Sequence, residues 1–154
     1  MSIGFKKSWT EGQIIWLIIR FIRYEPRPYL ITEVNNEWLV LVTLTTSEDK
    51  TEEENATQYV IQHESPLSRY EGSLINYDTL LSVNQEDLVK IMQATYRGKE
   101  VFSPFKLLNE TDLKLFKHKQ RLYFQNSKYQ KRLVKIIFAL NFSIAQELMP
   151  NYLK

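Results

Sequence analysis

The stretch R-P-Y-L-I-T-E-V-N-N-E-W-L-V-L-V-T-L-T, residues 27–45, decides the fold. Residues 29–34 and 37–45 are rich in the β-branched and aromatic side chains that suit a pleated strand. Asn35-Asn36 separates them, and asparagine tolerates the positive φ that a tight turn requires. The sequence therefore predicts an antiparallel hairpin.

The segment before this hairpin predicts another strand and a fixed cation. Residues 12–22 form an isoleucine-rich apolar run that is typical of a buried strand. Pro26 and Pro28 then restrict the backbone on both sides of Arg27. A surface arginine needs no such restriction, so Arg27 is a candidate for a side chain that points at a ligand.

Two further strands and a helix are predicted after the hairpin. Residues 47–56 are acidic without an apolar period and predict an exposed, mobile loop. Residues 58–63 predict a fourth strand, and residues 73–83 a fifth strand that could carry a bulge. Asn84 is placed to cap a helix over residues 85–96. Five short strands with meandering connections predict an α+β protein built on a small, bent barrel.

The C-terminal part predicts helices. Residues 109–112 have the composition of a helix start, with Leu113 and Phe116 as its apolar contacts. Over residues 129–149 the apolar side chains recur at helical spacing, which predicts a second long helix that ends before Pro150. The positions concerned are 133, 136, 137, 140, 144 and 148. We therefore expect a barrel domain over residues 1–96 and a basic helical extension over residues 97–154.

Composition excludes several classes of site. The 154 residues contain no cysteine, which excludes disulfides, cysteine-ligated zinc and thiol catalysis, and fits a reducing cytoplasm. His63 and His118 are the two histidines, and neither lies in a metal-binding motif, so no metal is expected. The apolar runs are too short to span a bilayer, which predicts a soluble protein without a membrane partner.

Charge is divided unevenly along the chain. Residues 1–88 hold 7 basic and 14 acidic residues, whereas residues 89–154 hold 13 and 4. A basic C-terminal part can attract phosphate. It can equally be a solvated helical face that offsets the acidic part, within one chain or across a dimer. The candidate nucleic-acid-binding residues are Lys117, Lys119, Arg121, Lys131 and Arg132.

Four segments in order carry a family resemblance. They are G-Q-I-I-W-L (12–17), R-P-Y-L-I (27–31), L-V-T-L-T-T-S (41–47) and S-L-I-N-Y-D-T-L-L-S-V-N-Q-E-D-L (73–88). In this order they resemble the PemK/MazF family of toxin endoribonucleases, over roughly residues 9–95. The resemblance implies an SH3-like barrel, usually a homodimer, that cleaves single-stranded RNA without a metal or other cofactor.

The resemblance also implies roles for individual residues. It places the family's arginine on Arg27 and its threonine on Thr45, beside Thr46. It places Asp78 and Ser82 near the same groove. Two further residues are candidates for proton transfer or support in the barrel half, namely Glu25 and His63.

The chemistry can be argued from the side chains themselves. In cleavage by transesterification, a ribose 2′-OH attacks phosphorus while negative charge develops on the phosphoryl oxygens. A guanidinium is a planar, two-pronged donor that suits phosphate, but its high pKa makes it a poor proton shuttle. We therefore expect Arg27 to stabilise the phosphoryl charge, and Thr45 to donate to the same phosphate or relay a proton.

Three functions remain open from the sequence. The first is an RNA-cleaving toxin, for which a small acidic antitoxin would be the expected protein partner. The second is a catalytically inactive barrel that binds nucleic acid or a protein. The third is a purely structural role in an assembly, with the apolar stripe between residues 133 and 148 as the dimer seam.

Overall fold

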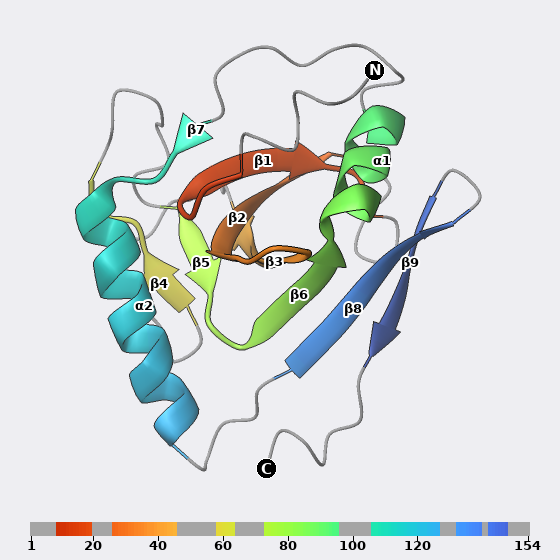
Figure 1. Ribbon diagram of the computed structural model, residues 1–154. Helices are drawn as coiled ribbons and strands as arrows, with labels where there is room; N and C mark the ends of the chain where they lie inside the picture. The colour runs from red at the N-terminus through yellow and green to blue at the C-terminus, as the bar shows by residue number, and fades with distance from the viewer. Residues whose placement is uncertain are drawn as a thin grey trace.

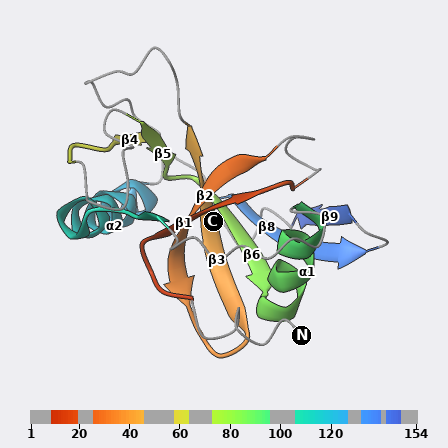
Figure 2. The same cartoon turned by 90° about the horizontal axis from the view of Figure 1, so that it is seen from above.

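The protein has an α+β architecture in which one mostly antiparallel sheet carries two helices. The computed structural model describes residues 9–19, 26–45, 58–63, 73–95, 106–126, 132–139 and 142–147. The strands are β1 (Gln13–Leu17), β2 (Arg27–Val34), β3 (Trp38–Thr45), β4 (Gln58–Val60), β5 (Leu74–Asn76), β6 (Thr79–Asn84), β7 (Lys106–Leu107), β8 (Arg132–Ala139) and β9 (Phe142–Glu147). The helices are α1 (Gln85–Thr95) and α2 (Glu110–Gln125). Figures 1 and 2 show the helices on opposite sides of the central strands.

The strand order shows that this sheet does not close. Its main path is β7-β1-β2-β3-β6-β8-β9, and β4 and β5 are attached beside β3. The path has two separate ends within the described residues, so the predicted five-stranded barrel is not present as a closed sheet there. The coarser prediction of an α+β fold is confirmed.

The hairpin predicted from residues 27–45 is confirmed. Strands β2 and β3 pair antiparallel from Tyr29 opposite Thr43 to Val34 opposite Leu39. Asn35 forms the turn, because its side-chain Oδ1 accepts a hydrogen bond from the Trp38 backbone N–H at 2.7 Å. The Asn35 N–H also donates to the Trp38 carbonyl at 3.0 Å. Asn35 therefore holds the turn between the two strands, and the register of the pair shifts once farther along, between Ile31 and Glu33.

The predicted fifth strand is interrupted in its middle. Strands β5 and β6 lie along the same edge of β3, with Ile75 opposite Leu44 and Leu81 opposite Leu41. The chain advances six residues on this edge while β3 advances three, so three extra residues are accommodated at the bend between the strands. The predicted bulge is therefore present, and it splits the segment into two strands.

Two apolar cores lie on the two sides of the sheet. Alternation along β2 sends Tyr29 and Ile31 to the core beneath α1, and Leu30 to the core beneath α2. Strand β3 serves both cores, since its first half contributes to the α1 core and its second half to the α2 core. The polarity of each face therefore changes along β3.

Both predicted helix starts are confirmed. The Asn84 Oδ1 accepts from the Glu86 N–H at 2.8 Å at the start of α1. The Asn109 Oδ1 accepts from the Thr111 N–H at 2.8 Å at the start of α2. In α2, Phe116 is fully buried in the second core. These caps satisfy backbone N–H groups that have no partner inside the helix.

The second long helix predicted over residues 129–149 is wrong. Strands β8 and β9 form an antiparallel hairpin there, and β8 pairs parallel with β6, with Val134 opposite Leu81. Val134 and Ile136 are buried in the α1 core. The free edge of β6 offers hydrogen bonds to a β-branched run, and this tertiary pairing overrides the helical spacing. The extension is therefore not purely helical, and its strands continue the same sheet.

Several other predictions are adjusted in length or left outside the described residues. Strand β1 ends at Leu17, before the end of the predicted run, and β4 ends at Val60. The predicted acidic loop over residues 47–56 lies outside the described residues. In the part of the chain that the structure describes, no helix is long and apolar enough to cross a membrane.

Candidate functional site

Arg27 and Thr45 lie at the same end of the hairpin formed by β2 and β3. Tyr29 lies opposite Thr43, and Arg27 lies two residues before Tyr29 while Thr45 lies two residues after Thr43. The paired residues of β2 and β3 end at Tyr29 and Thr43; extending this register by two residues would set Arg27 opposite Thr45 on the same face, with Cα atoms about 5 Å apart. Both side chains are half-buried. The predicted pair therefore shares one partly open surface.

Three more polar side chains extend this surface across β5 and β4. Gln58 lies opposite Asn76, and its Nε2 donates to the Asn76 Oδ1 at 2.9 Å. The Asn76 Nδ2 in turn donates to the Thr43 Oγ1. All three side chains are half-buried. We call the set formed by Arg27, Thr43, Thr45, Gln58 and Asn76 the polar face.

The reverse side of the same strands is sealed. Leu44, Tyr59 and Ile75 alternate with the residues of the polar face and are buried in the α2 core. The polar face thus lies on the side of β3, β5 and β4 that turns away from α2. It contains one guanidinium, two amides and two hydroxyls, and no carboxylate, so its charge favours an anionic ligand.

A second polar cluster lies at the junction of β4 and α2. The carboxylate of Asp112 is fully buried. Its Oδ1 accepts from the Tyr59 hydroxyl at 2.6 Å and the Gln62 N–H at 3.0 Å. Its Oδ2 accepts from the His63 N–H at 2.9 Å and lies 3.2 Å from the His63 Nδ1. We call Asp112, Tyr59, Gln62 and His63 the Asp112 cluster.

The Asp112 cluster fixes the orientation of His63. The imidazole side chain is 49% exposed, whereas the carboxylate beside it is fully buried. A carboxylate at Nδ1 favours the tautomer with a proton on that nitrogen, which leaves Nε2 as the acceptor. His63 contacts Asp112 on the α2 side of the sheet, whereas the polar face turns away from α2, so the structure does not bring His63 to the polar face with Arg27.

Asp78 and Ser82, which the family resemblance puts near one groove, lie in two different places in the structure. Asp78 lies in the bend between β5 and β6, where its Oδ1 accepts from the Thr79 hydroxyl at 3.2 Å. Ser82 lies opposite Val40, which is five residues before Thr45 on β3. An odd separation puts Ser82 and Thr45 on opposite faces, so the expectation that Ser82 shares the groove of Arg27 is wrong.

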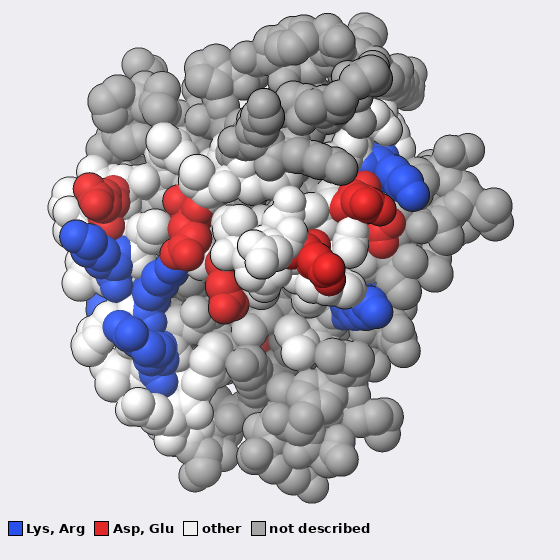
Figure 3. Space-filling view, in the orientation of Figure 1, with Lys and Arg blue, Asp and Glu red and all other residues white. Residues whose placement is uncertain are grey.

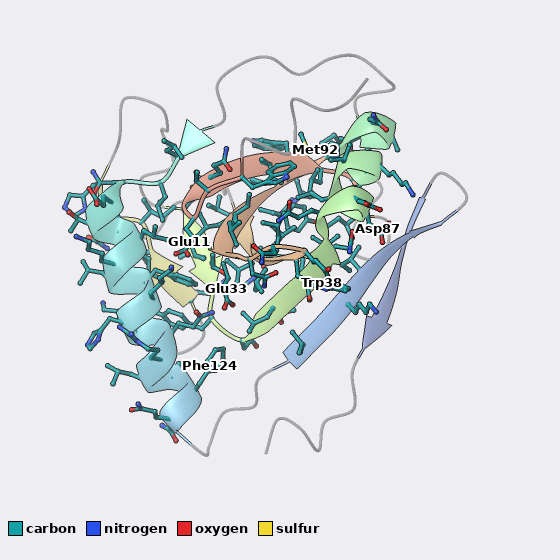
Figure 4. The ribbon with its side chains drawn as sticks, in the orientation of Figure 1. Glu11, Glu33, Trp38, Asp87, Met92 and Phe124 are labelled. Atoms are coloured by element: carbon teal, nitrogen blue, oxygen red, sulfur yellow. The ribbon has the colours of Figure 1, made fainter. Side chains whose placement is uncertain are left out.

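The predicted basic surface on α2 is only partly free for a ligand. Figure 3 shows Lys and Arg side chains gathered along the α2 side of this view, with acidic side chains next to them. The Lys117 Nζ pairs with the Glu11 carboxylate, and Figure 4 places Glu11 beside α2. The Lys119 Nζ lies 5.4 Å from the centre of the Tyr59 ring. Arg121 is exposed.

Partial burial, and then the nearby Arg121, lower the pKa of Lys117. The ion pair with Glu11 acts in the opposite direction because it favours the charged amine. Arg132 begins β8 opposite Thr79 and therefore lies on a different element from the α2 cations. The remaining predicted residues, Glu25, Thr46 and Lys131, lie outside the described residues.

Sequence reasoning missed Asp112 and the Thr43–Asn76–Gln58 row. Asp112 was counted only as one of several polar residues at a helix start, and its partners lie about fifty residues away in sequence. The amide row depends on the pairing of β4 with β5, which no local pattern fixes. Across the described residues, no group of three or more His, Cys, Asp or Glu side chains is placed to hold a metal ion.

Comparison of the chain with protein-family models, with curated proteins and with solved structures gives no match. The resemblance of its four segments to the PemK/MazF family therefore stays a prediction.

Proposed function

We propose that this protein is a metal-independent endoribonuclease of the toxin–antitoxin type, which cleaves single-stranded RNA at the polar face. The observation that carries the proposal is the pairing of Tyr29 with Thr43, whose register, extended by two residues, sets the half-buried Arg27 and Thr45 opposite one another. The family resemblance adds that strands β1 to β6 are the counterpart of an SH3-like barrel. It also adds a homodimer, an acidic antitoxin as partner and a cytoplasmic location.

The proposed reaction is a transesterification. The 2′ oxygen of a ribose forms a bond to the adjacent phosphorus while the bond from phosphorus to the 5′ oxygen breaks. The 2′ proton leaves to solvent, and a proton is returned to the 5′ oxygen, so the products carry a 2′,3′-cyclic phosphate and a 5′-hydroxyl. No external oxidant or metal is needed to balance this step.

Arg27 would stabilise the charge that develops on the phosphoryl oxygens. Its guanidinium can donate two parallel hydrogen bonds to them. Among the described residues, the polar face contains no carboxylate that would compete with RNA for this cation. The hydroxyl of Thr45 would donate to the same phosphate or relay a proton. A preorganised donor of this kind lowers the barrier by about 3–4 kcal/mol.

The backbone around Arg27 supports its preorganisation. Arg27 lies opposite Leu17 of β1, and Pro28 lies opposite Trp16. Pro26 and Pro28 fix φ on either side, and strand pairing restricts the arginine between them. Less conformational entropy is then lost when the side chain engages a phosphate.

The test is a cleavage assay on mixed-sequence single-stranded RNA in the presence of EDTA. We expect the full chain to cleave, to leave cyclic phosphate ends, and to lose about 100- to 1,000-fold in rate on Arg27→Ala. Arg27→Lys should restore little of the rate, because an ammonium lacks the two-pronged geometry. Lys90→Ala is the control, since it removes an exposed cation from α1, away from the candidate RNA-binding residues.

Two results would contradict the nuclease proposal. One is the absence of cleavage by the unaltered chain, and the other is cleavage that Arg27→Ala leaves unchanged. RNA binding without turnover would instead favour the second function, an inactive barrel that binds nucleic acid.

A further inference from the structure

We propose that Thr43, Asn76 and Gln58 form a subsite that contacts the base of the RNA nucleotide next to the cleaved phosphate. This inference rests on the proposed function, because it assumes that the phosphate lies at Arg27 and Thr45. It adds a source of base preference, which neither the sequence resemblance nor the Arg27–Thr45 pair supplies.

The row is continuous with the phosphate position. Thr43 lies on β3 two residues from Thr45, on the same face and about 7 Å away. Asn76 on β5 and Gln58 on β4 follow at successive strand spacings of about 5 Å. A nucleotide whose phosphate meets Arg27 can therefore lay its base across this row.

The hydrogen bonds within the row leave one donor and one acceptor site of the Asn76 amide for a base edge. An amide offers two N–H donors and a carbonyl oxygen with two acceptor sites, and a hydroxyl offers one donor. The Asn76 amide uses one donor toward Thr43 and one acceptor site toward Gln58. Paired amide groups of this kind match the adjacent donors and acceptors of nucleobase edges, which proteins read in single-stranded RNA.

Local preference does not explain why amides occupy these positions. Asparagine is depleted in strands, and a half-exposed cross-strand pair is stabilised equally well by β-branched side chains. The two amides are also fixed against one another, since Gln58 lies opposite Asn76 and donates to it. Holding two partly exposed amide side chains in one arrangement costs side-chain entropy. A role in base recognition would explain why amides occupy these positions.

The test measures binding and cleavage separately. Binding uses fluorescently labelled homo-oligonucleotides of the four bases with 2′-O-methyl sugars, which cannot be cleaved by this route. Cleavage uses a mixed-sequence RNA whose products are sequenced. The variants are Gln58→Ala, Asn76→Ala and the near-isosteric Thr43→Val, with Gln93→Ala as a control that removes an exposed amide from α1.

We expect the unaltered chain to bind its preferred base at least fivefold more tightly than its least preferred base. Gln58→Ala and Asn76→Ala should reduce this ratio to about twofold or less, while Gln93→Ala leaves it unchanged. The same variants should broaden the cleaved sequences without abolishing cleavage. Gln58→Glu keeps the size of the side chain, and should alter the ranking of bases even if Asn76→Ala fails to fold.

The outcomes distinguish the two proposals. Base-selective binding that depends on Gln58 and Asn76, without cleavage by any variant, would support the subsite and overturn the nuclease. Cleavage whose base preference is the same in all folded variants would support the nuclease and overturn the subsite. A chain that binds the four oligonucleotides equally also overturns it.

Discussion

The polar face and the Asp112 cluster lie on adjacent strands, yet they use their polar groups in different ways. In the Asp112 cluster, a fully buried carboxylate accepts from two backbone N–H groups and the Tyr59 hydroxyl, and contacts the imidazole of His63. On the polar face, the side chains are half-buried, and the Asn76 amide retains a donor and an acceptor site beyond its bonds to Thr43 and Gln58. The Asp112 cluster therefore stabilises the fold, whereas the polar face can bind a ligand.

This difference follows from the cost of burying polar groups. A buried carboxylate is tolerated only when its oxygens are satisfied, so its partners are committed to it. A half-exposed amide or guanidinium remains solvated in the absence of ligand and can exchange water for a phosphate or a base. Changes in the Asp112 cluster should therefore reduce stability, whereas changes on the polar face should reduce activity.

The largest stability effect is expected for Asp112→Ala. Removing the carboxylate leaves the Tyr59 hydroxyl and the N–H groups of Gln62 and His63 without their acceptor, which should lower the free energy of unfolding by about 3 kcal/mol. Urea denaturation measures this loss. Glu110→Ala, two residues away and paired only at the surface with Lys114, should change stability by less than about 0.5 kcal/mol. Equal effects from both variants would contradict a structural role for Asp112.

A smaller loss is expected for Tyr59→Phe. The ring remains packed edge-on against Phe116, with ring centroids 6.1 Å apart, while the 2.6 Å hydrogen bond to Asp112 disappears. Because the bond is to a charged acceptor, the unfolding free energy should fall by about 1.5–3 kcal/mol. Thermal or urea unfolding would show this, and RNA cleavage should be unchanged below the melting range. A loss of cleavage in folded Tyr59→Phe would show that the Asp112 cluster also serves the reaction.

Thr43→Val tests whether the polar face contributes little to stability, in contrast to the Asp112 cluster. It replaces a half-buried hydroxyl by a methyl group of the same shape on a strand, where valine is well accommodated. We expect a stability change of less than about 1 kcal/mol, together with the change in base preference described above. A loss as large as that of Asp112→Ala would mean that the polar face is structural.

The smallest effect concerns pH and Lys117. Because burial and Arg121 lower the pKa of Lys117, the folded protein binds fewer protons than the unfolded chain between that pKa and the ordinary value of 10.5. Stability should therefore rise with pH across this window relative to Lys117→Met, by less than about 1 kcal/mol. Urea unfolding of both proteins at matched pH values measures the difference. A relative fall with rising pH would show that the ion pair with Glu11 dominates.

The parts of the fold that were predictable are those encoded by neighbouring residues. The Asn35 turn, the start of α1 at Asn84 and the start of α2 at Asn109 are all local, and each is present as predicted. The opposition of Arg27 and Thr45 needs more than this hairpin, because the register shifts between Ile31 and Glu33, on the way from the turn to Arg27. No local pattern in the sequence predicts that shift, so only the hairpin itself could be predicted.

The parts that were mispredicted depend on distant partners. The run over β8 contains β-branched residues, and their spacing also fits a helix. The segment forms a strand because it pairs with the edge of β6, which lies about fifty residues earlier in the sequence. Asp112 resembles an ordinary acidic residue of a helix first turn until β4 is packed against it. The place of Ser82 was implied by the family resemblance alone, and its pairing with Val40 on β3 puts it on the other face from Thr45.

The most direct test of the account is a double-mutant cycle between Arg27 and Thr45. Values of kcat/KM for single-stranded RNA in EDTA would be measured for the unaltered chain, Arg27→Ala, Thr45→Val and the double variant. If both side chains act on one phosphate, the double variant should be less impaired than the product of the single losses, with a coupling of about 1 kcal/mol or more. Losses that multiply independently would contradict the shared site.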